Sequence, residues 1–158
     1  MEKHVLTKPD GRRLMLYADQ PWACPSEAPS PTCERREPSS HLRWHPLRGE
    51  WIAYASHRQN RTFLPPAEFN PLAVTTDPSH PTELPPGPWD VAVFENLFPT
   101  LAAAARVPPA LDVPTRPGGG ACEVVVFTQD PTTSLGALPL SRLDLIARVW
   151  ADRYTELG

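Results

Sequence analysis

The sequence ends in the stretch SRLDLIARVWADRYTELG, Ser141–Gly158, in which apolar residues recur at helical spacing. Ser141 is a natural N-cap residue, Asp144 occupies the capping-box position, and Gly158 suits a C-cap. The pattern predicts an amphipathic helix over residues 141–158. Its apolar stripe comprises Leu143, Ile146, Ala147, Trp150, Tyr154 and Leu157.

Upstream of this helix, three short runs favour β-strands. The first, Glu50–Ala55, is rich in aromatic and β-branched residues and follows the turn sequence PLRG of residues 46–49. The second is Trp89–Glu95. The third, Cys122–Thr128, contains the run VVVF, which predicts a strand buried on both faces.

The N-terminal residues predict a β-hairpin. His4–Thr7 and Arg12–Tyr17 flank the turn sequence Pro9-Asp10-Gly11, which has the chemistry of a tight reversal. Short strands followed by one long amphipathic helix predict an α+β fold. In this fold the helix packs on one face of a mostly antiparallel sheet.

The remaining segments are irregular, and proline is the outlier of the composition, with 22 residues of 158. A proline-rich connector, Pro21–Pro38, and a long segment, Arg61–Pro88, show no hydrophobic period. Leu101–Gly120 begins with an alanine run that favours one or two helical turns, and proline and glycine then end it.

The bulk composition limits the classes of function. A net charge of -3 argues against binding to nucleic acid or to an anionic membrane surface. No run reaches the about 18 apolar residues of a membrane helix, and the N-terminus lacks the apolar core of a signal peptide, so we expect a cytoplasmic protein. Cys24, Cys33 and Cys122 match no zinc spacing and are expected to be plain thiols.

Arginines cluster after the strand Glu50–Ala55. Arg58 and Arg61 stand three residues apart, so in a turn both guanidinium groups could reach one anion such as a pyrophosphate. The alternative is that they are surface arginines lying over Trp51 or Tyr54. The residues alone leave both interpretations open.

A second candidate cluster follows the strand Trp89–Glu95. Asn96 stands between Phe94 and Phe98, where its amide could hydrogen-bond a ribose hydroxyl or a base edge. The alternative is a turn asparagine between two core phenylalanines. The histidines have no partners at zinc spacing, and neither a phosphate-binding glycine loop nor a nucleophile elbow is present.

These motifs occur in the same order in a known family. They are HLRWHPL at 41–47, GEWI at 49–52, SHR at 56–58 followed by Arg61, FENLFP at 94–99, and LPLS at 138–141 leading to the WADRYTELG of 150–158. Over residues 40–158 the chain resembles the N-terminal half of galactose-1-phosphate uridylyltransferases. Residues 1–39 would form a separate hairpin and connector.

The resemblance implies a fold related to the histidine-triad nucleotide-binding proteins. It also implies a ping-pong reaction, in which a histidine takes the uridylyl group from UDP-glucose and passes it to galactose 1-phosphate. Arg58 and Arg61 match family positions near the phosphates. Phe94, Asn96 and Phe98 match the strand end that contacts uridine, and Val124 matches a residue near the uracil.

Departures from the family pattern carry their own predictions. Where many members have zinc ligands, this chain reads FNPLAV at 69–74 and TQDP at 128–131, so we expect no zinc and no other cofactor. Leu97 replaces the family's aspartate after the asparagine. The nucleophile belongs to a His-Pro-His motif downstream of the last helix, and that motif does not occur in this sequence, so we expect no catalytic residue in this chain.

Three hypotheses remain. The chain is the N-terminal, substrate-contacting part of a uridylyltransferase, which acts with a C-terminal half or as a homodimer. Alternatively, it is a non-catalytic module that binds nucleotide sugar or pairs with a longer homologue. A third possibility is a relative that uses adenine nucleotides.

Overall fold

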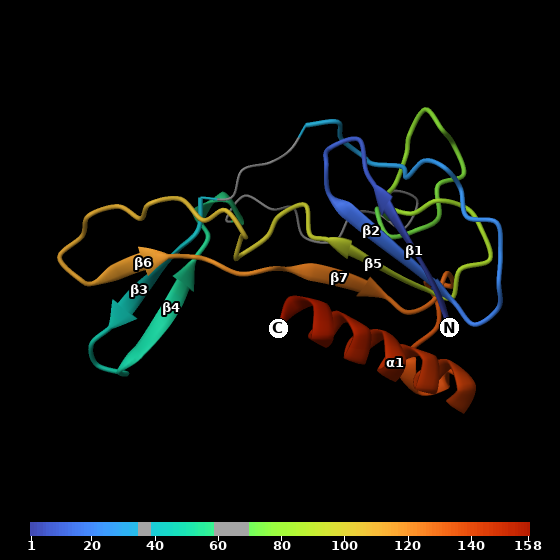
Figure 1. The fold of residues 1–158 in the computed structure, drawn as a ribbon. Helices are drawn as coiled ribbons and strands as arrows, with labels where there is room; N and C mark the ends of the chain where they lie inside the picture. The colour runs from blue at the N-terminus through green and yellow to red at the C-terminus, as the bar shows by residue number, and fades with distance from the viewer. Residues whose placement is uncertain (35–38, 59–69) are drawn as a thin grey trace. The chain divides into compact units, whose positions relative to one another are not determined.

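The computed structural model describes residues 1–34, 39–58 and 70–158 (Figure 1). The chain divides into two units. Unit 1 comprises Met1–Arg35, Pro65–Phe94 and Val124–Gly158, and unit 2 comprises Arg36–Leu64 and Glu95–Glu123. The domain boundary predicted at residue 40 stays a prediction. In the described part of the chain, no helix is long and apolar enough to cross a membrane.

A four-stranded sheet with the order β1-β2-β5-β7 forms the centre of unit 1. Strands β1 (Glu2–Thr7) and β2 (Arg13–Ala18) make the predicted hairpin, and β2 pairs antiparallel with β5 (Val91–Glu95). Gly11 supplies the positive φ of 81° that the turn requires. Strand β7 (Glu123–Val126) lies at the other edge of the sheet.

Helix α1 (Leu140–Leu157) covers one face of this sheet (Figure 1). Leu145, Ile146 and Val149 pack in one cluster with side chains of β2 and β5. This arrangement confirms the predicted α+β fold class. The β2 and β5 residues in the cluster are Met15, Tyr17, Val91 and Val93.

Two details of the helix prediction were wrong. The helix begins at Leu140 with Pro139 as N-cap and without a side-chain cap, so Ser141 lies inside the first turn. A proline with its fixed φ can precede a helix without a hydroxyl cap. Only part of the predicted apolar stripe faces the core, because Ile146 is buried there but Trp150 is 53% exposed and Tyr154 is 82% exposed.

The opposite face of the sheet carries a second apolar layer. Leu14, Leu16, Ala92 and Phe94 pack there against the loop residues Ala28, Leu84 and Trp89. The valines of β7 contribute to both layers, since Val124 and Val126 contact this one and Val125 contacts the helix side. They remain only half-buried because β7 is an edge strand, which corrects the prediction of a strand buried on both faces.

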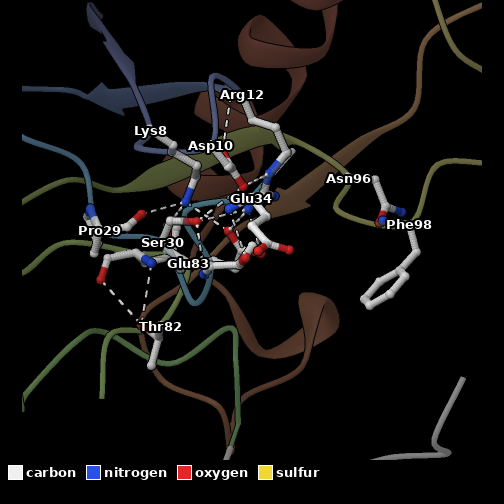
Figure 2. A network of polar contacts seen from close by, with 12 residues as sticks. Lys8, Asp10, Arg12, Pro29, Ser30, Glu34, Thr82, Glu83, Asn96 and Phe98 are labelled. Atoms are coloured by element: carbon white, nitrogen blue, oxygen red, sulfur yellow. Dashed lines mark hydrogen bonds and ion pairs between the residues drawn. The ribbon is translucent and has the colours of Figure 1, made fainter. Parts of the chain in front are cut away.

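A buried ion network joins the hairpin turn to two irregular segments of unit 1 (Figure 2). Lys8 Nζ lies 2.8 Å from Glu83 Oε2, and Arg12 Nη2 lies 2.8 Å from the same oxygen. Arg12 Nε also donates to Asp10 Oδ2 at 2.6 Å. Burial lowers the pKa of Lys8. Burial alone would raise the pKa of Asp10, but hydrogen bonds from Arg12 outweigh this effect and lower the Asp10 pKa.

Unit 2 contains a three-stranded antiparallel sheet with the order β4-β3-β6. Its strands are β3 (His41–His45), β4 (Glu50–Tyr54) and β6 (Thr115–Pro117). Strand β4 matches the predicted run, whereas β3 and β6 were not predicted. The predicted helical turns after Leu101 are absent, because Ala102 forms a parallel β-bridge with Gly119 instead.

Candidate functional site

The loop that follows β5 begins with an asparagine turn. Asn96 donates its backbone N–H to the Cys122 carbonyl at 2.8 Å, and its Oδ1 accepts the Phe98 N–H at 2.9 Å. Asn96 therefore does form a turn, as the alternative interpretation proposed, but the turn uses only the side-chain oxygen of the amide. In the part of the chain that the structure describes, the Asn96 Nδ2 has no hydrogen-bond partner.

Arg58 holds the next part of this loop. It ends a short 3-10 helix, η1 (Ser56–Arg58), and its Nη1 donates to the Phe98 carbonyl at 2.8 Å and to Thr100 Oγ1 at 3.0 Å. Among residues 1–34, 39–58 and 70–158, Nε and Nη2 find no acceptor. A half-buried guanidinium group with donors to spare suits an anion.

The aromatic rings of β4 are covered by other arginines. The Arg116 guanidinium lies 3.6 Å from the centre of the Trp51 ring, and that of Arg43 lies 4.1 Å from the centre of the Tyr54 ring. Arg58, for which a place over Trp51 or Tyr54 was the alternative, is bound through its guanidinium group to the loop after β5.

His57, next to Arg58 on η1, contacts the same loop. Its Nε2 lies 3.1 Å from the Pro99 carbonyl oxygen, and since a carbonyl only accepts, Nε2 carries the proton. Its Nδ1 is buried and has no partner among the described residues. An unsatisfied buried polar atom costs about 1–3 kcal/mol.

Three of the predicted site residues, Arg58, Asn96 and Phe98, come together in unit 2. Phe94 and Val124 belong to unit 1. Phe94 is only 2% exposed and its ring centre lies 5.1 Å from Lys8 Nζ, so the chain itself covers this ring. Arg61 lies outside the described residues. The contacts predicted for these residues with a nucleotide stay predictions.

Sequence reasoning missed two residues that shape the site. Thr100 provides the second acceptor for Arg58, and the Cys122 carbonyl anchors the start of the loop. Both contacts join residues more than 20 positions apart. No local pattern signals them, although Thr100 directly follows the FENLFP motif.

Metal ligands do not gather in the described ranges 1–34, 39–58 and 70–158. Within them, no group of three or more histidine, cysteine or acidic side chains could hold a metal ion. All three cysteines are free thiols. Burial raises the pKa of the Cys24 thiol.

The family model and the known proteins that match this chain all point to one family. The sequence model described as "Galactose-1-phosphate uridyl transferase, N-terminal domain" matches residues 30–158. A galactose-1-phosphate uridylyltransferase of Streptomyces lividans is 32% identical over 158 residues, which cover 100% of this chain and 40% of the relative. That of Thermotoga maritima is 31% identical over 123 residues, which cover 74% of this chain and 36% of the relative.

The rat enzyme of the same name is 28% identical over 140 residues, which cover 78% of this chain and 36% of the relative. The chain therefore spans about two fifths of the length of these relatives. No solved structure matches it. The family match confirms the resemblance found in the motifs: the chain belongs to the galactose-1-phosphate uridyl transferase family and carries its N-terminal domain.

Proposed function

We propose that this chain is the N-terminal, substrate-contacting part of a UDP-glucose–hexose-1-phosphate uridylyltransferase of galactose metabolism. The observation that carries the proposal is the loop Asn96–Thr100, which the fold holds in place while leaving donors free. The Asn96 Nδ2 and the outer Arg58 nitrogens have no partners in the described chain. Donors fixed in this way suit a uridine ribose and a diphosphate.

The proposed contacts of Asn96 and Arg58 with the nucleotide use the atoms that their contacts within the described part of the chain leave free. The Asn96 Nδ2 would donate to an oxygen of the uridine, since its Oδ1 is engaged in the turn. Arg58 would neutralise a phosphate through Nε and Nη2 while Nη1 anchors the loop. Arg61, Phe98 and Val124 would complete the nucleotide contacts, as the family resemblance implies, whereas the buried Phe94 ring would support the strand end from the core.

The uridylyl-accepting histidine is not part of the proposal for this chain. The resemblance assigns it to a His-Pro-His motif, which the 158 residues do not contain. The proposed role of these residues is to bind UDP-glucose and then galactose 1-phosphate, in the cytoplasm and without a metal cofactor. A C-terminal half would supply the nucleophile, because a second copy of these 158 residues lacks the motif as well.

The substitution Asn96→Asp tests the proposal, because the carboxylate would keep an oxygen that accepts the Phe98 N–H and lose the NH₂ donor. Titration calorimetry with UDP-glucose on the native protein should show affinity weakened by about tenfold or more, as expected for a lost hydrogen bond of ~1.4 kcal/mol. The melting temperature should change little.

Asn70→Asp is the matched control, because Asn70 also accepts a backbone N–H through Oδ1 in an exposed turn. Its affinity for UDP-glucose should equal that of the unchanged protein. If Asn96→Asp also binds UDP-glucose as well as the unchanged protein, the amide is only a turn residue and the proposed role of this loop is wrong.

A further inference from the structure

His57 stands out because the proposed function gives it no task. It contacts the loop through Nε2 and keeps a buried Nδ1 without a partner in the described chain. Native proteins rarely retain such an atom without a reason.

Two neighbours on η1 hold two neighbouring carbonyls of the loop. Arg58 donates to the Phe98 oxygen at 2.8 Å and His57 to the Pro99 oxygen at 3.1 Å. Arg58 also donates to Thr100 Oγ1 at 3.0 Å, so the His57 bond fixes the carbonyl of Pro99, which lies between the two residues that Arg58 holds. Pro99 adds to this rigidity through its fixed φ.

The other end of the loop is fixed independently. Asn96 is bound through its N–H to Cys122 and through Oδ1 to Phe98. The Phe98 residue is thus held by its N–H on one side and by its carbonyl on the other. A shift of Pro99 would move Phe98, and with it the direction of the Asn96 amide.

We infer that His57 is a positioning residue, which through its Nε2–H and the Pro99 carbonyl holds the loop Asn96–Thr100 in its nucleotide-binding shape. The imidazole does not touch the nucleotide in this role. The inference rests on the proposed function for its ligand, but the clamp itself is a property of the free chain. Its effect is to bring the loop to the nucleotide already ordered, which improves affinity.

Two substitutions separate positioning from mere filling of space. In His57→Gln the side-chain amide nitrogen can reach the place of the imidazole Nε2 and donate to Pro99. In His57→Asn the shorter amide reaches only the place of Nδ1 and leaves the Pro99 carbonyl without its donor. Both variants remove the ring, so a purely steric role would affect them alike.

Amide hydrogen exchange on the free chain is the first measurement. In His57→Asn the Phe98 amide, which donates to Asn96 Oδ1, should exchange about fivefold to tenfold faster than in the unchanged chain, as the loss of one hydrogen bond implies. In His57→Gln it should stay within about twofold of the unchanged chain. Equal exchange rates in all three proteins would overturn the clamp.

UDP-glucose affinity of the native protein is the second measurement. His57→Asn should weaken binding by about tenfold, and His57→Gln should recover most of it. Equal losses in both variants would overturn the positioning role. If the unchanged protein does not bind UDP-glucose, the proposed function fails and the exchange rates alone decide the clamp.

Discussion

Changing Glu83 to glutamine removes a buried anion from a network that contains two buried cations. Its carboxylate is bound by Lys8 Nζ at 2.8 Å and by Arg12 Nη2 at 2.8 and 3.1 Å, and Glu83 is only 4% exposed. After the change, Asp10 remains as a buried carboxylate beside Arg12, and Lys8 loses the carboxylate that it contacts.

The expected loss of stability follows from that imbalance. Removing one partner of a buried ion pair costs about 3–5 kcal/mol. Glutamine keeps one oxygen acceptor, so we expect about 3 kcal/mol, near the lower end of that range. Such a loss is a large share of the ~5–15 kcal/mol that stabilises an ordinary domain.

Urea unfolding followed by circular dichroism measures this difference. Asp144→Asn is the matched control, because it removes a carboxylate in the same unit that pairs with Arg148 at 3.0 Å in an exposed position. The control should lose only about 0.3–0.5 kcal/mol. A loss below ~1 kcal/mol for Glu83→Gln would refute the reasoning, since an unpaired buried charge costs more than that.

The double variant Lys8→Met/Glu83→Gln adds an internal check. It removes one cation together with one anion, which restores the charge balance that each single variant disturbs. It should lose clearly less stability than the sum of the two single variants, because the residues are in contact. Additive losses would show that Lys8 and Glu83 do not act as a pair.

Two further predictions concern unit 1. Hydrogen bonds from Lys3 and Arg153 lower the pKa of Glu156 from 4.5 to about 2, so the folded state takes up this proton at a lower pH than the unfolded state. The stability of the fold should therefore decrease as the pH drops from 4.5 towards 2 in acid titrations followed by circular dichroism. Glu156→Gln should flatten this decrease, and an unchanged curve would contradict the assignment. Gly87→Ala should destabilise the fold by about 1–3 kcal/mol in thermal melts, because the φ of Gly87 is +149° and a Cβ would meet the Trp22 ring at 2.8 Å. The control Gly136→Ala has open space around it and should change the stability by no more than about 0.5 kcal/mol. Equal melting temperatures for the two variants would refute the steric argument.

Local sequence signals were enough for part of the fold. The sequence Pro9-Asp10-Gly11 located the hairpin because an Asp-Gly pair is a strong turn signal, and Gly11 does adopt a positive φ. The period of residues 141–158 located the helix, and its place at the end of several short strands indicated the fold class. The true core side of the helix did not follow, because burial of Leu145 and Val149 depends on how α1 meets β2 and β5.

Non-local pairing explains what the sequence did not reveal. His41–His45 alternates polar and apolar residues without a β-branched side chain, and it forms a strand because β4 and β6 flank it. The alanine run has helical propensity, but the backbone of Ala102 forms hydrogen bonds with Gly118 and Gly120 instead. Tertiary contacts override a weak local preference in such cases.

For the site, the sequence indicated the residues but not their contacts. Arg58 and Asn96 were singled out by residue type and by position after a strand. Arg58 uses one nitrogen to hold the Phe98 carbonyl, which is a contact between distant segments. Asn96 uses one oxygen to form a turn, which depends on the backbone geometry. These contacts decide which atoms remain for a ligand.

The transfer reaction itself is the central claim, and isotope exchange tests it most directly. The native protein, isolated from its source cells, is incubated with UDP-glucose and labelled glucose 1-phosphate in the absence of galactose 1-phosphate. A ping-pong uridylyltransferase should move label into UDP-glucose, because the uridylyl group passes reversibly to the enzyme. Binding of UDP-glucose without any exchange of label would contradict the transferase account and leave the chain as a nucleotide-sugar-binding module.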